Sequence, residues 1–442
     1  MLTTSPYWDR LWVIQEAALA REPQAYLGEA CSPFWDLLEA FTKLTLAERD
    51  GQVPPMDLNP LAVVRMKTAK AVQSLKTHKP GPLSVIHVCS LLQATSAAET
   101  KEEHDRVFGL LGLLPDDIVV MPDYSLDVVD VYTYTVSRLM EELGSLHLLA
   151  YAGVYPGRLA GLPSWSLDFA EIKKLGVYGR WNFRADAAIE VKSGIISNRR
   201  ATKHLGVQAR AFDTVTWFGP PCPDMNFPED LESTSERSLR FQEVLLSWRL
   251  ELGTRKEGKS DHRKVSLAFW RMITNDTIYT EDDGVQNERR WTADDYLDAH
   301  DYDRWLMSEG EILTPRMRWL ALGMSASNAV MFFTQAGGIG MTSARHDLHT
   351  GTGNNIEEAQ QDDMIAARPS IANATLIVAI IAGLACPCLL RRSPTEFSDT
   401  FQFMGAAYVD DVMYGEIILR AIGEREDQSS DPSDVFEQIS LV

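Results

Sequence analysis

Glu16 is the first side chain in this 442-residue sequence whose setting could favour chemistry. It follows Gln15 beside a face formed by Trp8 and Trp12, where burial against indole rings would raise the pKa of a carboxylate. Such a glutamate can serve as a general acid or base. Most helical glutamates are exposed or ion-paired, so we assign no catalytic residue and name Glu16 only as a weak candidate.

Three other short motifs have a chemical and a structural interpretation. His104-Asp105 could orient an imidazole, but no G-x-S-x-G nucleophile motif accompanies it, so we expect the start of a helix or strand. The glycine-rich 337–340 lacks the Lys-Ser or Lys-Thr of a phosphate loop, which predicts a hairpin turn. Cys386 and Cys388 are too close together for an ordinary zinc knuckle, which predicts buried thiols. We expect no cofactor and no metal.

Composition limits the classes of partner. Lys and Arg number 42 against 62 Asp and Glu, and this net charge of -20 disfavours nucleic acid and anionic membranes. Five cysteines spread over a long chain do not form a dense disulfide framework, so we expect reduced thiols and a cytoplasmic protein. The protein partners and the oligomeric state stay open.

Residues 374–390 are uncharged and allow two interpretations. They could form a short membrane span, or two buried strands that fold back at Gly383. The β-branched residues in the first half favour the hairpin.

The elements that would position these residues follow from periodicity and turn chemistry. The apolar run at 104–114 stops at Pro115, and Ser125 is expected to cap the next helix, which Gly144 would end. Helices are predicted at 8–19, 34–41, 61–75, 83–95, 126–143, from 228 onward and at 267–273. Strands are predicted at 24–27, 187–191, 204–208, 212–215, 328–335, 376–382, 385–390 and 401–409.

The predicted helices and strands together indicate an α+β fold, in which a helical front (about 1–145) packs with strand and hairpin elements of the middle and end. We expect loops between these elements. The loops are a charged segment at 253–264, an acidic surface insertion at 281–303 and a polar excursion at 344–367. We expect the chain to divide into six parts. After a first segment at 1–30 come a helical region at 31–160, a mixed strand region at 161–222 and a second helical region at 223–325. A small sheet at 326–420 and a disordered acidic tail at 421–442 follow.

Several phrases, in order along the chain, resemble the fungal heterokaryon-incompatibility (HET) family. PYWDRLWVIQEAALA resembles its W-x-R-x-W-x-x-Q-E segment, HDRVFGLLGL and PDYS resemble a second block, and LPSWSLDF, FWRMITND and FMGAAYVDDVMYGE resemble three more. The chain departs from the family at Arg106, at Ser166-Leu167 and at Asp410-Asp411, where the family usually has Lys, a proline and His-Gly. The residues at the positions of the family motifs are Trp8, Arg10, Trp12, Gln15, Glu16, Asp105, Arg106, Gly109, Leu110, Gly112, Pro122, Asp123, Tyr124, Pro163, Trp165, Asp168, Gly405, Tyr408, Gly415 and Glu416.

The resemblance implies a role in fungal nonself recognition and programmed cell death, exerted through protein contacts. The phrases of the main body of the HET domain are not seen, so residues 1–30 are expected to be its end, through either a late gene model or a natural, inactive remnant. The alternatives are a TIR-like NAD-consuming hydrolase, whose site would involve that main body, and a membrane-associated protein anchored by 374–390.

Overall fold

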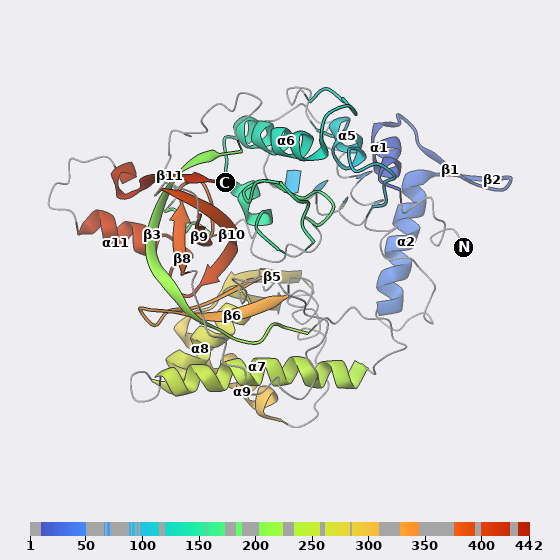
Figure 1. Cartoon of the computed structure of the whole chain (residues 1–442). Helices are drawn as coiled ribbons and strands as arrows, with labels where there is room; N and C mark the ends of the chain where they lie inside the picture. The colour runs from blue at the N-terminus through green and yellow to red at the C-terminus, as the bar shows by residue number, and fades with distance from the viewer. Residues whose placement is uncertain are drawn as a thin grey trace, which may run out of the picture. The chain divides into compact units, whose positions relative to one another are not determined.

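The computed structural model of the protein (Figure 1) shows an α+β chain that forms two compact units. Unit 1 comprises residues 1–148, 159–162 and 166–173, and unit 2 comprises 149–158, 163–165 and 174–442. The structure describes residues 10–49, 66, 69–70, 88–89, 91–92, 95, 98–114, 120–155, 157–172, 183–187, 203–223, 234–256, 261–282, 285–308, 328–343, 375–393, 399–424 and 432–442.

The described part of unit 1 is mostly helical, as its periodicity predicts. Its longer elements are α1 (Trp12–Leu19), α2 (Phe34–Arg49), α5 (Asp105–Leu111) and α6 (Val128–Leu143), with a hairpin of β1 (Gln24–Leu27) and β2 (Ala30–Pro33). The predicted helices at 61–75 and 83–95 lie largely outside the described residues, although 66, 69–70, 88–89, 91–92 and 95 are helical.

The start of α6 corrects one expectation. Asp127, and not Ser125, caps the helix, because its carboxylate accepts a hydrogen bond from the backbone N–H of Val129 at 2.8 Å. Ser125 instead donates to Asp123, two residues earlier. The predicted end is confirmed, since Gly144 takes the left-handed conformation with φ 56°.

Unit 2 is built on a seven-stranded sheet. Its strands are β3 (Leu205–Phe218), β6 (Ala329–Thr334), β7 (Ile339–Ser343), β8 (Leu376–Ile381), β9 (Cys388–Arg392), β10 (Thr400–Val409) and β11 (Glu437–Leu441), in the order β11-β10-β7-β6-β3-β8-β9. β10 also pairs with β9, and β11 also pairs with β3, so the pairings close into a ring.

The two long strands make this closure possible because each changes partner along its length. β3, the long curved strand of Figure 1, pairs with β11 and β8 in its first part and with β6 in its last, and its register shifts at 211–213 and 215–217. β10 pairs with β9 up to Ala406 and with β7 from Ala407. The two strands predicted at 204–208 and 212–215 are therefore one continuous strand. The interior core includes Val330, Phe332, Val378, Ile380, Leu389, Met404 and Ala407.

Residues 375–390, the described part of 374–390, form the predicted hairpin. β8 and β9 pair antiparallel with Leu376 opposite Arg391, and Gly383 in the turn has φ 84°. The side chains of Val378, Ile380 and Leu389 are fully buried in the core. None of the helices in the described part of the chain combines the length with the apolar composition that a bilayer span requires.

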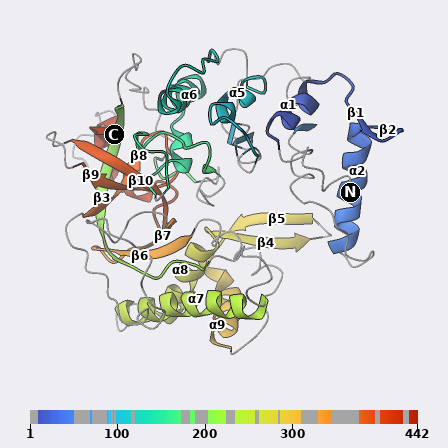
Figure 2. The same ribbon diagram turned by 45° about the vertical axis from the view of Figure 1, so that its right-hand side comes forward.

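The region expected to be a charged loop and an acidic insertion is folded. α7 (Thr234–Lys256) and α8 (His262–Ile273) extend into 253–264, and 281–303 contributes to the hairpin of β4 (Thr277–Asp282) and β5 (Val285–Arg290) and to α9 (Tyr296–Met307). Figure 2 shows α7, α8 and α9 together below this hairpin. Most of the described residues of 281–303 are exposed, as a surface insertion requires, and ion pairs such as that of Arg289 with Asp295 hold them in place.

The expectation of a disordered tail over 421–442 is also wrong where the structure describes it. α11 (Glu416–Gly423) extends into it, and β11 pairs antiparallel with β3, with Ile439 opposite Val207. Leu441 is fully buried. The hydrogen bonds between β11 and β3 and the burial of Leu441 order this segment despite its acidic, Ser-rich composition. The excursion predicted at 344–367 and residues 425–431 lie outside the described part.

Gly340 on β7 provides a test of the ring. A Cβ atom there would lie 2.6 Å from the backbone oxygen of Tyr408 and 2.3 Å from the ring of Phe332. The backbone oxygen cannot move without breaking the β7–β10 pairing, so Gly340→Ala should lower the free energy of unfolding by about 1–3 kcal/mol. Urea titration measures this change. In Gly253→Ala the added Cβ meets open space on α7, so stability should stay constant or rise by up to about 1 kcal/mol. Equal effects at both positions would contradict the prediction.

Candidate functional site

Family-like residues of α1 and α5 lie against each other in unit 1. A Cβ atom on Gly109 would lie 2.8 Å from Cδ2 of Leu11, and one on Gly112 would overlap the amide of Gln15. Arg10 pairs as an isolated bridge with Glu99 just before α1 begins. The glycines of α5 therefore allow close helix packing, a structural role.

His104 and Asp105 hold the loop that follows α5. Asp105 accepts a hydrogen bond from the Tyr124 hydroxyl at 2.7 Å, and this bond raises the pKa of Tyr124. His104 Nε2 lies 2.9 Å from the backbone oxygen of Leu126, and the rings of Phe108 and Tyr124 meet edge to face at 5.0 Å. The helix start predicted here is confirmed, and the pair fixes the loop at 121–126.

This 121–126 loop presents large apolar side chains to solvent. Met121 is 76% exposed, Tyr124 55% and Leu126 47%. Asp123 is exposed beside them, as are Pro122 and Asp127. Exposed apolar side chains so close together in the chain can contribute to a contact surface, and the carboxylates around them favour a basic partner.

Glu16 does not have the environment that its catalytic interpretation requires. Its side chain is exposed on α1, although burial was the expected cause of a raised pKa. Trp8, half of the expected indole face, lies outside the described residues. A cavity in unit 1 lined by Leu11, Arg106 and Leu110 has a volume of about 10 Å³, which is enough for at most one water molecule.

The residues of the LPSW phrase take part in structural hydrogen bonds. In unit 2, Trp165 is fully buried and its indole N–H donates to the backbone oxygen of Lys203 at 3.0 Å. Next to Pro163, the hydroxyl of Ser164 donates to the backbone oxygen of Val442. In unit 1, Asp168 accepts hydrogen bonds from the backbone N–H of Leu159 and Ala170.

A cluster of charged side chains in unit 2 lies where α8 ends and β10 ends. Arg271 Nε lies 3.3 Å from both Asp276 Oδ1 and Asp410 Oδ1, and its Nη2 lies 3.1 Å from Asp411 Oδ1. Arg290 Nε donates to the other Asp276 oxygen at 2.8 Å. We name these five residues, with Tyr408 and Tyr414, the Arg271 cluster.

The backbone of the Arg271 cluster is strained. Three of its residues or their neighbours have positive φ without being glycine: Asn275 at 50°, Asp276 at 54° and Asp411 at 60°. The amide N–H of Asp276 closes the turn by donating to the Arg271 oxygen at 2.6 Å. Left-handed backbone at two carboxylates places both of them on one guanidinium, which ties the end of α8 to the end of β10.

Asp410 has an unusual acidity. Burial raises its pKa to about 7, and the nearby carboxylates of Asp411 and Asp276 act in the same direction. The attraction of Arg271 and a hydrogen bond from the Tyr408 hydroxyl oppose the rise without cancelling it, because one guanidinium is shared by three carboxylates. Asp410 can therefore hold or release a proton near neutral pH. Neither of the two pockets described here is lined by it.

Sequence reasoning saw Asp410-Asp411 only as a departure from the HET pattern. FWRMITND contains Arg271 and Asp276, and FMGAAYVDDVMYGE contains Tyr408, Asp410, Asp411 and Tyr414, while Arg290 lies outside both phrases. The signal that could have found it was the complementary charge of Arg271 and Asp410 in two separate family-like phrases.

Comparison of the chain with known proteins does not assign a function to these residues. No family model, curated protein or solved structure matches the chain. Membership of the HET family therefore stays a prediction from the phrases.

The remaining residues of the last family-like phrase shape the backbone. Gly405 lies where the pairing of β10 with β9 shifts register. Gly415 has φ 90° before α11, and a Cβ atom there would lie 2.8 Å from the Cβ of Ala187. Glu416 accepts a hydrogen bond from the backbone N–H of Tyr414 at 2.8 Å.

The other motifs with a chemical alternative have structural roles. Cys386 and Cys388 are fully buried, and burial raises the pKa of Cys386 to about 12, so it is held as a neutral thiol. All five cysteines are free thiols. Gly337 and Gly338 of the glycine-rich 337–340 lie in the predicted turn between β6 and β7, and Ile339 and Gly340 begin β7.

Proposed function

We propose that the protein acts in the cytoplasm of a fungus in heterokaryon incompatibility, as a HET-type protein that recognises a partner by direct protein contact. The observation that carries the proposal is the pairing of family-like phrases within each unit. In unit 1 the first phrase packs on the second, where Leu11 meets Gly109. In unit 2 the fourth phrase meets the fifth through Arg271 and Asp410.

Contact rather than catalysis fits the roles of these residues. The described residues of the phrases are engaged in intramolecular packing, hydrogen bonds and ion pairs, and Glu16, the carboxylate named for an NAD-consuming reaction, is exposed. The 121–126 loop is exposed, apolar and held in place by Asp105. We propose this loop as the contact surface, and a partner segment with apolar side chains flanked by Lys or Arg fits it.

The proposal predicts a loss of incompatibility when the loop is made polar. Met121→Ser/Leu126→Ser should allow two otherwise incompatible strains to form a viable heterokaryon, because the apolar contact is removed while the fold is kept. The readout is the survival of fused cells after pairing, together with protein level. Leu419→Ser is the matched control, since Leu419 is a similarly exposed apolar residue, 59% exposed on α11.

Two outcomes would contradict the proposal. One is that deletion of the gene changes no pairing in a panel of strains. The other is that the loop variant and Leu419→Ser retain incompatibility equally at equal protein level.

A further inference from the structure

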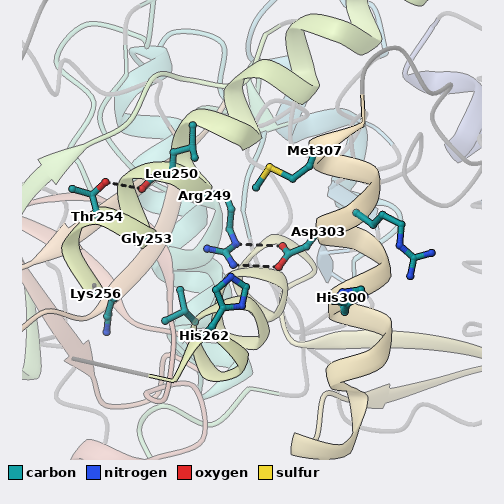
Figure 3. A pocket seen from close by; sticks show the side chains of 11 residues that line it. Arg249, Leu250, Gly253, Thr254, Lys256, His262, His300, Asp303 and Met307 are labelled. Atoms are coloured by element: carbon teal, nitrogen blue, oxygen red, sulfur yellow. Dashed lines mark hydrogen bonds and ion pairs between the residues drawn. The ribbon is translucent and has the colours of Figure 1, made fainter. Parts of the chain in front are cut away.

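The helices α7, α8 and α9 line a pocket with a volume of about 780 Å³ (Figure 3). This volume lies within the range of roughly 300–1,000 Å³ that small-molecule sites occupy. Nothing in the family-like phrases lines the pocket, so its function is separate from the proposed recognition.

A fixed ion pair forms one wall of the pocket. Arg249 Nε and Nη2 lie 3.3 and 3.2 Å from the two carboxylate oxygens of Asp303, and Ser266 and Trp270 also donate to this carboxylate, at 2.7 and 2.9 Å. Burial alone would raise the pKa of Asp303, but these hydrogen bonds hold it below its usual range. Asp303 therefore stays ionised, with its charge committed to Arg249.

The other ionisable side chains that line the pocket are basic. Arg304 is paired with Asp301 at 2.8 Å, and the imidazole of His300 lies 3.8 Å from the same carboxylate, so Lys256 and His262 provide the basic groups at this end of the pocket. A basic lining is unusual in a chain with a net charge of -20. It favours an anionic ligand.

The opposite end of the pocket is apolar. Leu250 is 56% exposed and Met307 is 54% exposed, and both line the pocket. In Figure 3 these two side chains lie on one side of the Arg249–Asp303 pair, and His262 lies on the other. A ligand that matches both ends has an apolar group at one end and an anionic group at the other.

We propose that this pocket binds a nucleoside triphosphate, with the base between Leu250 and Met307 and the phosphates toward Lys256 and His262. The size of the pocket accommodates such a molecule. Phosphate oxygens accept hydrogen bonds from ammonium and imidazole N–H groups, and the two exposed apolar side chains would be covered by the base.

Calorimetric titration of the full chain with ATP tests the proposal. We expect a Kd below about 100 µM that weakens when the salt concentration is raised from about 0.05 to 0.5 M. Inorganic triphosphate and adenosine should each bind at least about tenfold more weakly than ATP, because each engages one end only. Triphosphate binding as tightly as ATP would overturn the assignment of the apolar end.

Gly253→Phe blocks the pocket without changing its charge. A side chain at Gly253 enters open space within the lining, so ATP binding should fall at least about tenfold. Gly423→Phe is the matched control, since Gly423 also faces open space but lies on α11, and it should bind as the unchanged protein does. Lys256→Ala/His262→Ala, which alters two side chains at helix ends, should also bind more weakly. Thermal unfolding confirms that each variant is folded.

Three results would overturn the proposal. They are no ATP binding up to about 1 mM, unchanged binding in folded Gly253→Phe, and tighter binding of an acidic peptide such as oligoglutamate than of ATP. The last result would assign the pocket to a protein partner.

Discussion

Arg271→Ala should lower the free energy of unfolding by about 3–5 kcal/mol, the range seen when one partner of a buried ion pair is removed. The substitution leaves three carboxylates without their shared cation. Asp276 is fully buried and Asp410 nearly so, and neither can be resolvated without opening the junction between α8 and β10. Arg290 would still neutralise Asp276, so Asp410 carries most of the loss.

Urea unfolding followed by tryptophan fluorescence measures this effect, because Trp270 lies next to Arg271 in the sequence and is buried in the same unit. Arg304→Ala is the control. Arg304 also pairs with an aspartate, but both side chains are exposed, so the change should be below about 1 kcal/mol. Similar effects from the two substitutions would show that the Arg271 cluster does not stabilise unit 2.

Asp410→Asn should remove a pH dependence of stability from the unchanged protein. Because the folded-state pKa of Asp410 is raised from 3.8 to about 7, the folded state binds more protons than the unfolded state between these values. The contribution of this group to stability is thus full below about pH 4, falls as the pH rises toward 7, and is lost above it. A displacement of this size corresponds to at most about 4 kcal/mol.

The measurement is the difference in the free energy of unfolding between the unchanged protein and Asp410→Asn, taken from pH 4 to pH 8. The asparagine variant should gain relative stability as the pH rises, because it lacks the buried charge. Asp411→Asn is the matched control, since Asp411 touches the same guanidinium but its side chain is 79% exposed. A difference for Asp410→Asn that is constant with pH would contradict the raised pKa.

Neighbouring residues were enough to predict the local elements. The apolar spacing of 126–143 and the terminal Gly144 indicated α6, and the β-branched run before Gly383 indicated the β8–β9 hairpin. These features depend on periodicity and on backbone geometry at one or two positions, which a single segment encodes. The α+β class followed from the same signals.

Predictions made from composition fail where a polar residue pairs with a residue from another segment of the chain. The acidic stretch at 281–303 contains Asp295, whose side chain is buried and accepts two hydrogen bonds from the guanidinium of Arg289. These bonds lower the pKa of Asp295 to about 2. The tail was expected to be disordered, yet Leu441 is buried where β11 meets β3. Charge and serine content do not reveal a partner elsewhere in the chain.

The sequence by itself determined the α+β class, the hairpin turns at Gly337 and Gly383, the end of α6 at Gly144, and the family-like phrases. Only the tertiary structure decided that β3 and β10 close the sheet into a ring, that Glu16 is exposed, and that Arg271 meets Asp276, Asp410 and Asp411. The physical reason is that burial and charge pairing are set by segments far apart in the chain. The acidity of Asp410 and the basic pocket of α7, α8 and α9 exist only after those segments meet.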